Sequence, residues 1–116
     1  MAYEPLYERF EVAGPDGRKL PVEFRRAGFL TVGDTPELYF FQVAGQETVV
    51  GISGSALKRF EDGRRLSREE KIDLAGFWLK QQIEAGATLD SRNLFLRDEE
   101  LARMAGSLSI QSKRNP

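Results

Sequence analysis

Apolar and polar residues alternate with a helical period between residues 66 and 86, and the prediction for the rest of the chain starts from this stretch. At about 100° per residue, its apolar side chains fall into two stripes on opposite sides of a helix. The first stripe contains Ile72, Ala75, Gly76, Leu79 and Ile83, and the second contains Leu74, Phe77, Trp78 and Ala85. A helix with two apolar stripes has two surfaces to bury.

The ends of this predicted helix carry specific local signals. Ser67 stands three residues before Glu70, which is the spacing of a capping box, in which each side chain binds an N–H group of the first turn. Gly86 suits the helix end, because glycine adopts the left-handed conformation there without strain. We expect the first stripe to lie on a sheet. The second stripe needs another cover, which is the C-terminal segment, a second copy of the chain or a foreign partner.

Residues 7–53 show the pattern of strands instead. Apolar and polar side chains alternate along 7–13 and along 19–26, and the turn-forming residues 14–17 join the two segments. This arrangement predicts an antiparallel hairpin. Pro21 lacks a backbone donor, so we expect its strand to lie at an edge of the sheet.

A second hairpin is predicted from residues 38–44 and 47–52. A two-residue type II′ turn at Gly45-Gln46 would place Phe41 opposite Val50. The core-facing side chains of this hairpin are then Tyr39, Phe41, Val43, Val50 and Ile52. Phe40 and Val49 point to the other face, where they form an exposed apolar patch if that face is open.

Two shorter helices complete the prediction, over residues 56–60 and 99–105, the second capped by Asp98. The apolar triplet at 94–96 is too short to assign. The polar tail 107–116 is expected to fray.

The predicted fold class is therefore α+β. An antiparallel sheet of four or five strands within residues 7–53 packs on one long helix, 66–86, with a short helix before it and another after it. The chain of 116 residues has the length of one domain, so residues 1–116 are expected to form a single domain.

Composition excludes several classes of function. The formal net charge is −1, which gives no long-range field to attract nucleic acid or an anionic membrane. No run approaches the roughly 18 apolar residues of a membrane span, and the N-terminus has no basic start followed by an apolar core. We therefore expect a cytoplasmic protein without a membrane association.

The chain contains no cysteine and no histidine. It therefore lacks the thiolate nucleophile, the most common general base and the most common metal ligand. Carboxylates cluster only where helices are predicted to start, where negative charge is favoured by the helix dipole. We predict no catalytic residue, no cofactor and no metal site, and we expect that the protein is not an enzyme.

Basic residues cluster around the turn before the long helix, and they suggest an alternative. Their side chains would contact phosphate groups of a nucleic acid; they are Lys58, Arg59, Arg64, Arg65 and Arg68. Acidic residues are interleaved with them at Glu61, Asp62, Glu69 and Glu70. This mixture favours a turn with ion pairs over a nucleic-acid site.

The preferred hypothesis is a small non-enzymatic interaction module that forms a homodimer or binds a protein partner. The residues predicted to form the contact are Leu74, Phe77 and Trp78 on the second helix stripe, or Phe40 and Val49 on the outer sheet face. A nucleic-acid-associated accessory protein is the first alternative. A small-ligand binder or enzyme that uses carboxylates and arginines is the second.

Overall fold

The computed structural model describes residues 6–29, 36–61, 65–90 and 92–108. The fold is α+β, as the sequence predicts, with five strands and three helices in the described part. In chain order the elements are β1 (Arg9–Ala13), β2 (Lys19–Phe29), β3 (Glu37–Val43), β4 (Gln46–Ile52), α1 (Gly54–Phe60), α2 (Arg68–Glu84), β5 (Phe95–Leu96) and α3 (Asp98–Ser107). Residues 109–116 of the predicted tail lie outside the described residues.

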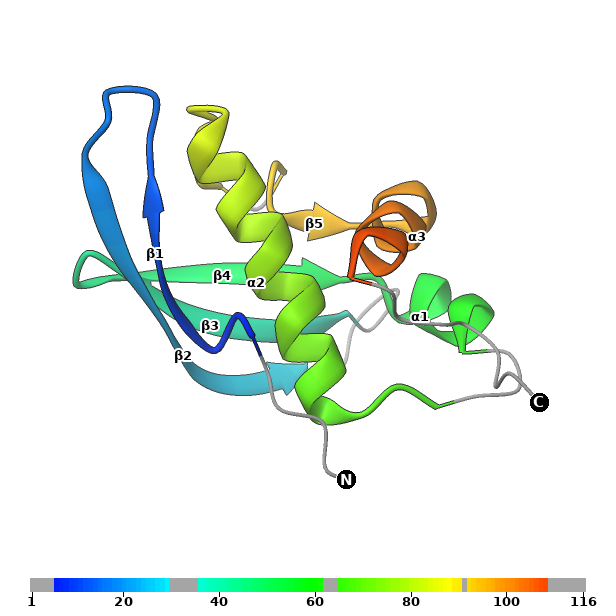
Figure 1. Ribbon diagram of the computed structural model, residues 1–116. Coiled ribbons are helices and arrows are strands. Elements are labelled where there is room, and N and C mark those ends of the chain that lie inside the picture. The colour runs from blue at the N-terminus through cyan, green and yellow to red at the C-terminus, as the bar shows by residue number, and fades with distance from the viewer. Residues whose placement is uncertain (1–5, 30–35, 62–64, 91, 109–116) are drawn as a thin grey trace.

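The strands form one curled sheet in the order β1-β2-β3-β4-β5 (Figure 1). The first three pairs are antiparallel, but β5 pairs parallel to β4, so the predicted purely antiparallel sheet is wrong. The unassigned triplet 94–96 contains β5, and the Leu94 and Leu96 carbonyls accept hydrogen bonds from the Gly51 and Ser53 N–H groups at 2.8 and 2.9 Å. A parallel neighbour needs a crossover connection, and here the connection contains α1 and α2.

The β3–β4 hairpin differs from the prediction in register. Phe41 lies opposite Thr48, and Val43 lies opposite Gln46. The turn is formed by Ala44 and Gly45, whose φ values of 50° and 85° fit a type I′ turn rather than the predicted type II′ turn. The register is shifted by two residues, and because side chains alternate with a period of two, the predicted core-facing residues still face the core.

The predicted edge position of Pro21 is wrong, because β2 pairs with β1 on one side and with β3 on the other. The Pro21 carbonyl accepts a hydrogen bond from Ala44 at 2.9 Å. Its nitrogen faces the same side, where β3 has already ended at Val43. The missing donor of the proline therefore falls opposite Ala44, beyond the last β2–β3 pair at Val22 and Val43.

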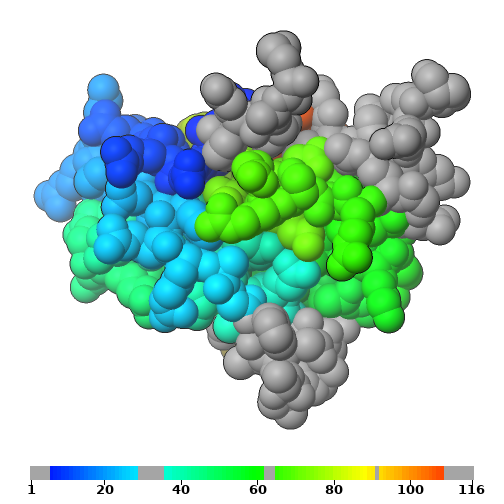
Figure 2. All heavy atoms as spheres, turned by 90° about the horizontal axis from the view of Figure 1, so that it is seen from below, coloured from blue at the N-terminus to red at the C-terminus, as the bar shows by residue number. Residues whose placement is uncertain are grey.

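Helix α2 lies across one face of the sheet and contacts β1, β4 and α3 (Figure 1). Viewed from below, its green first turn lies beside the cyan end of β2 (Figure 2). Its first stripe is buried at Ile72, Ala75, Leu79 and Ile83, which are at most 5% exposed. These side chains join the inward-facing residues of the sheet in one hydrophobic cluster.

The predicted signals at the ends of α2 are confirmed. The Ser67 hydroxyl accepts a hydrogen bond from the Glu70 N–H at 3.1 Å, and the Glu70 carboxylate accepts one from the Ser67 N–H at 2.9 Å. Gly86 follows the helix with φ of +72°. Helix α3 differs from its prediction, because its N-cap is Arg97, whose N–H donates to Glu100 at 3.1 Å. Asp98 is already the first helical residue.

The N-terminal segment crosses the side of α2 that carries Asp73 and Gly76. The N–H groups of Leu6 and Tyr7 both donate to Oδ1 of Asp73 at 2.8 Å, and Asp73 is fully buried. A Cβ atom on Gly76 would lie 2.6 Å from the Tyr7 carbonyl oxygen and 2.6 Å from its Cβ. Gly76 is therefore needed here for a close approach of two backbones, and it does not lie against the sheet as predicted.

We expect that Gly76→Ala destabilises the protein by about 1–3 kcal/mol, because the added methyl group collides with a backbone that Asp73 holds in place. The free energy of unfolding, measured with urea, tests this expectation. Gly106→Ala is the matched control, because a Cβ there meets nothing within 4 Å and alanine is the better residue inside a helix by about 0.5–1 kcal/mol. Equal stability of Gly76→Ala and wild type would contradict the close approach.

Candidate functional site

The second stripe of α2, which the sequence offered as a partner surface, is covered from within the chain. Leu74 is 0% exposed and Trp78 is 8% exposed. The indole N–H of Trp78 donates to the Asn93 carbonyl at 2.9 Å, and the Arg103 guanidinium lies 5.6 Å from the indole ring. The segment after α2 thus covers Trp78, and both Leu74 and Trp78 are buried in the fold.

Phe77, the third residue of that predicted surface, is half-buried and contacts the N-terminal segment. Its ring lies 5.3 Å from the ring of Tyr7, which in turn meets Phe10 edge to face at 5.4 Å. Such aromatic pairs add about 0.5–1.5 kcal/mol beyond the area they bury. Both chain ends therefore cover the second stripe, one on each side.

Two described members of the predicted basic cluster have partners within the chain. Arg59 binds Asp98 of α3 through two hydrogen bonds of 2.8 and 2.6 Å, and Arg68 lies 5.3 Å from the Phe24 ring. Lys58 and Arg65 are exposed, and Arg64 lies outside the described residues. Two members thus have intramolecular partners, which weakens the nucleic-acid hypothesis.

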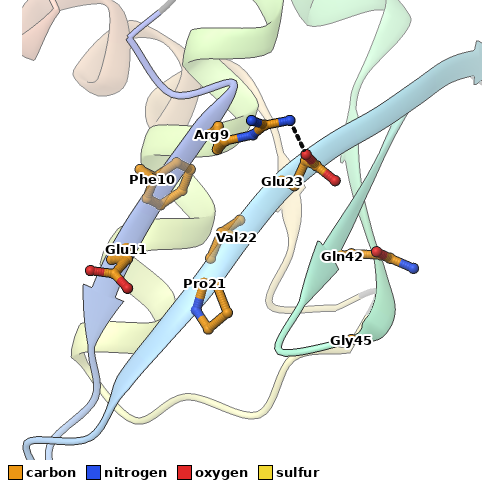
Figure 3. Close-up of a pocket in the computed structure, with 8 residues that line it drawn as sticks. All are labelled: Arg9, Phe10, Glu11, Pro21, Val22, Glu23, Gln42 and Gly45. Atoms are coloured by element: carbon orange, nitrogen blue, oxygen red, sulfur yellow. Dashed lines mark hydrogen bonds and ion pairs between the residues drawn. The ribbon is translucent and has the colours of Figure 1, made fainter.

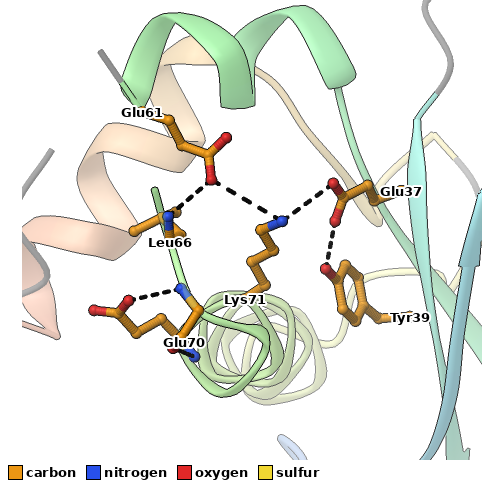
Figure 4. A network of polar contacts seen from close by, with 7 residues as sticks. Glu37, Tyr39, Glu61, Leu66, Glu70 and Lys71 are labelled. Atoms are coloured by element: carbon orange, nitrogen blue, oxygen red, sulfur yellow. Dashed lines mark hydrogen bonds and ion pairs between the residues drawn. The ribbon is translucent and has the colours of Figure 1, made fainter. Parts of the chain in front are cut away.

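A partly buried polar network joins the start of β3 to the start of α2 (Figure 4). The Lys71 ammonium lies 3.2 Å from the Glu37 carboxylate and 4.0 Å from that of Glu61. Glu37 also accepts a hydrogen bond from the Tyr39 hydroxyl at 2.6 Å, and Glu61 accepts one from the Leu66 N–H at 2.8 Å. Each carboxylate thus binds both Lys71 and a second donor. The network therefore has a structural role and holds neighbouring elements together.

The outer face of the sheet, opposite α2, exposes a strip of apolar side chains. Along β3, Phe40 is half-buried between the buried Tyr39 and Phe41, and Leu38 is half-buried as well. Phe40 lies directly opposite the half-buried Val49 of β4. The Arg26 guanidinium covers part of the strip, 3.8 Å from the centre of the Phe40 ring.

The strip continues into a groove of about 470 Å³ at the β5 side of the sheet. Its apolar walls come from Leu38, Val49 and Phe95, with Leu89 at the rim. The groove floor includes Gly51, where a Cβ atom would lie 2.8 Å from the Phe95 ring. Glycine at this position therefore allows the Phe95 ring to approach β4 closely.

A second hollow of about 420 Å³ lies at the other end of the sheet, over β1, β2 and the end of β3. Figure 3 shows Arg9 and Glu23 pointing toward each other across its rim, and their side chains form an ion pair. Glu23 also accepts a hydrogen bond from Arg25 at 2.8 Å. The hydrogen bond from Arg25 has the largest effect on the pKa of Glu23 and that from Arg9 the next largest, and both lower this pKa.

Charges of both signs border the apolar strip in similar number. Arg26 pairs with Glu47 at 3.7 Å, and Glu23 pairs with both Arg9 and Arg25. A surface of mixed sign does not select a highly charged polymer, but it suits a partner with the same mixture of charges.

Metal, membrane and family signals are not found in the described part of the chain. No group of three or more acidic side chains there is placed to hold a metal ion, and no helix there is long and apolar enough to cross a membrane. No family model, curated protein or solved structure matches the chain.

The sequence identified part of the outer strip and missed the rest. Phe40 and Val49 were predicted, and the same alternation along β3 would also have indicated Leu38. Phe95 was missed, because its position depends on a parallel pairing that no local pattern encodes. Leu89 lies in the connection after α2 and carries no periodic signal.

Tyr39, a member of the polar network, is 2% exposed and should make the stability of the fold depend on pH. Burial, and then the hydrogen bond to Glu37, raise the pKa of Tyr39 well above its ordinary value. The folded state thus holds the phenolic proton more tightly than the unfolded state. This stabilisation is complete below about pH 10, the unfolded pKa, and is lost as pH rises toward the folded pKa.

We expect that the free energy of unfolding of the wild type falls above about pH 10 and that Tyr39→Phe falls less steeply over the same range. Urea unfolding at a series of alkaline pH values compares the two proteins. Parallel curves for both proteins would contradict the assigned role of Tyr39.

Proposed function

We propose that this chain is a non-enzymatic interaction module that self-associates through the outer face of its sheet. The observation that carries the proposal is the apolar strip on this face, with Phe40 opposite Val49 at its centre and Leu38 and Phe95 beside them. None of these four side chains is fully buried. Contiguous apolar surface bordered by polar residues is typical of protein contact sites.

The proposed occupant is a second copy of the chain, because the border of the strip is self-complementary. Arg26 and Glu47 lie side by side on the same face, so a twofold axis that passes between them places each arginine near the other copy's glutamate. Closed twofold pairs are the most common assemblies of soluble proteins. The second stripe of α2, the other surface considered, is already occupied by the chain itself.

We expect that the wild type self-associates and that Val49→Lys lowers the association constant at least tenfold, because two ammonium groups would enter an apolar contact. Sedimentation equilibrium over a range of concentrations measures the constant. Val49 is half-buried, so the long lysine side chain reaches solvent and the fold persists, which thermal unfolding verifies.

Lys58→Glu is the control, because Lys58 is exposed on α1 and is not part of the outer strip. This variant is expected to associate like the wild type. A wild type that stays monomeric at its highest soluble concentration, or an unchanged constant for Val49→Lys, would overturn the proposed function.

A further inference from the structure

Strand β1 forms one edge of the sheet, and its backbone shows which groups that edge presents. The Phe24 N–H donates to the Glu8 carbonyl at 2.7 Å, so Glu8 faces β2. Backbone groups alternate in direction along a strand. Phe10 and Val12 therefore face β2 as well, while the N–H and C=O groups of Arg9 and Glu11 point away from the sheet.

These outward groups have no partner among the residues that the structure describes. The side chains beside them are also open to solvent, with that of Arg9 80% exposed and those of Glu11 and Ala13 exposed as well. An edge with free donors and acceptors is a template for another strand.

We propose that β1 pairs antiparallel with β1 of a second copy, with Phe10 opposite Phe10 on the twofold axis. In this register Arg9 lies opposite Glu11 of the other copy, and Glu11 lies opposite the other Arg9. All four of these residues present outward backbone groups, so the pairing makes four backbone hydrogen bonds. It also makes two cross-strand pairs of opposite charge, which stabilise an antiparallel pair.

Charge selects this register over its neighbours. A twofold axis at Arg9 would oppose two arginines, and an axis at Glu11 would oppose two glutamates. An axis at Val12 would place Glu11 opposite Ala13 and gain no charge pair. Only the axis at Phe10 pairs opposite charges, and the same charges therefore disfavour the other alignments and most foreign strands.

The edge pairing is independent of the outer-face contact proposed above. Its twofold axis is perpendicular to the sheet, whereas an axis between two stacked sheets is parallel to them. The two contacts therefore use different residues and perpendicular axes, which is the relation found in tetramers of D2 symmetry. Each contact can fail without the other.

The experiment uses the full chain with Val49→Lys, so that outer-face pairing does not contribute. We expect a dimer from this protein in sedimentation equilibrium. Either Arg9→Glu or Glu11→Arg, added to this protein, places like charges opposite each other at both cross-strand pairs. We expect each change to weaken the dimer about tenfold or more. Mixing the two variants restores dimerisation, because each strand then faces the opposite charges. A protein that carries both Arg9→Glu and Glu11→Arg dimerises as well, because the charges are exchanged and still pair. Lys58→Glu, added as a control, leaves the dimerisation unchanged.

Hydrogen exchange supplies a second readout. The amides of Phe10 and Val12 bond to β2 and are protected at every concentration, but those of Arg9 and Glu11 gain protection only as the dimer forms. A Val49→Lys protein that stays monomeric, or variants that do not recover on mixing, would overturn the edge pairing. In that case, a lower association constant for Val49→Lys than for the wild type would still support the outer-face contact by itself.

Discussion

The structure depends on burying both sides of α2. The first side lies in the same hydrophobic cluster as the inward face of the sheet, and the second is covered by the two ends of the chain. The N-terminal segment is held by the buried Asp73 and fits only because residue 76 is glycine. The segment after α2 holds Trp78 by a hydrogen bond from its indole. Removing either cover would expose apolar surface of the helix to water.

Several arginines in this protein cover aromatic rings. Four guanidinium groups lie within 6 Å of a ring centre, those of Arg26, Arg68, Arg97 and Arg103. Such contacts are found roughly once per 70–80 residues in proteins, so the described part of this chain is rich in them. The planar group shields an apolar ring while staying hydrated at its edge. Of the basic residues first suspected, Arg68 covers a ring in this way, whereas Arg59 binds the Asp98 carboxylate.

The architecture was predictable to the level of its elements, whereas the surfaces were predictable only in part. Local chemistry, such as the Ser67–Glu70 pair and the alternation along β3, identified the helix and the outward position of Phe40 and Val49. The register of the β3–β4 hairpin was wrong by two residues, because Ala44 adopts a positive φ that is rare for a residue other than glycine. Since two residues is the period of a strand, the error left every side chain on its correct face.

The sequence by itself determined the α+β class, the two apolar stripes of α2 and the absence of cysteine and histidine chemistry. These properties follow from residue types and short-range spacing. Tertiary structure alone decided that β5 joins β4 in parallel, that the segments flanking α2 cover its second stripe, and that β1 lies at an edge of the sheet. Each of these outcomes depends on contacts between residues far apart in the chain, which no local pattern encodes.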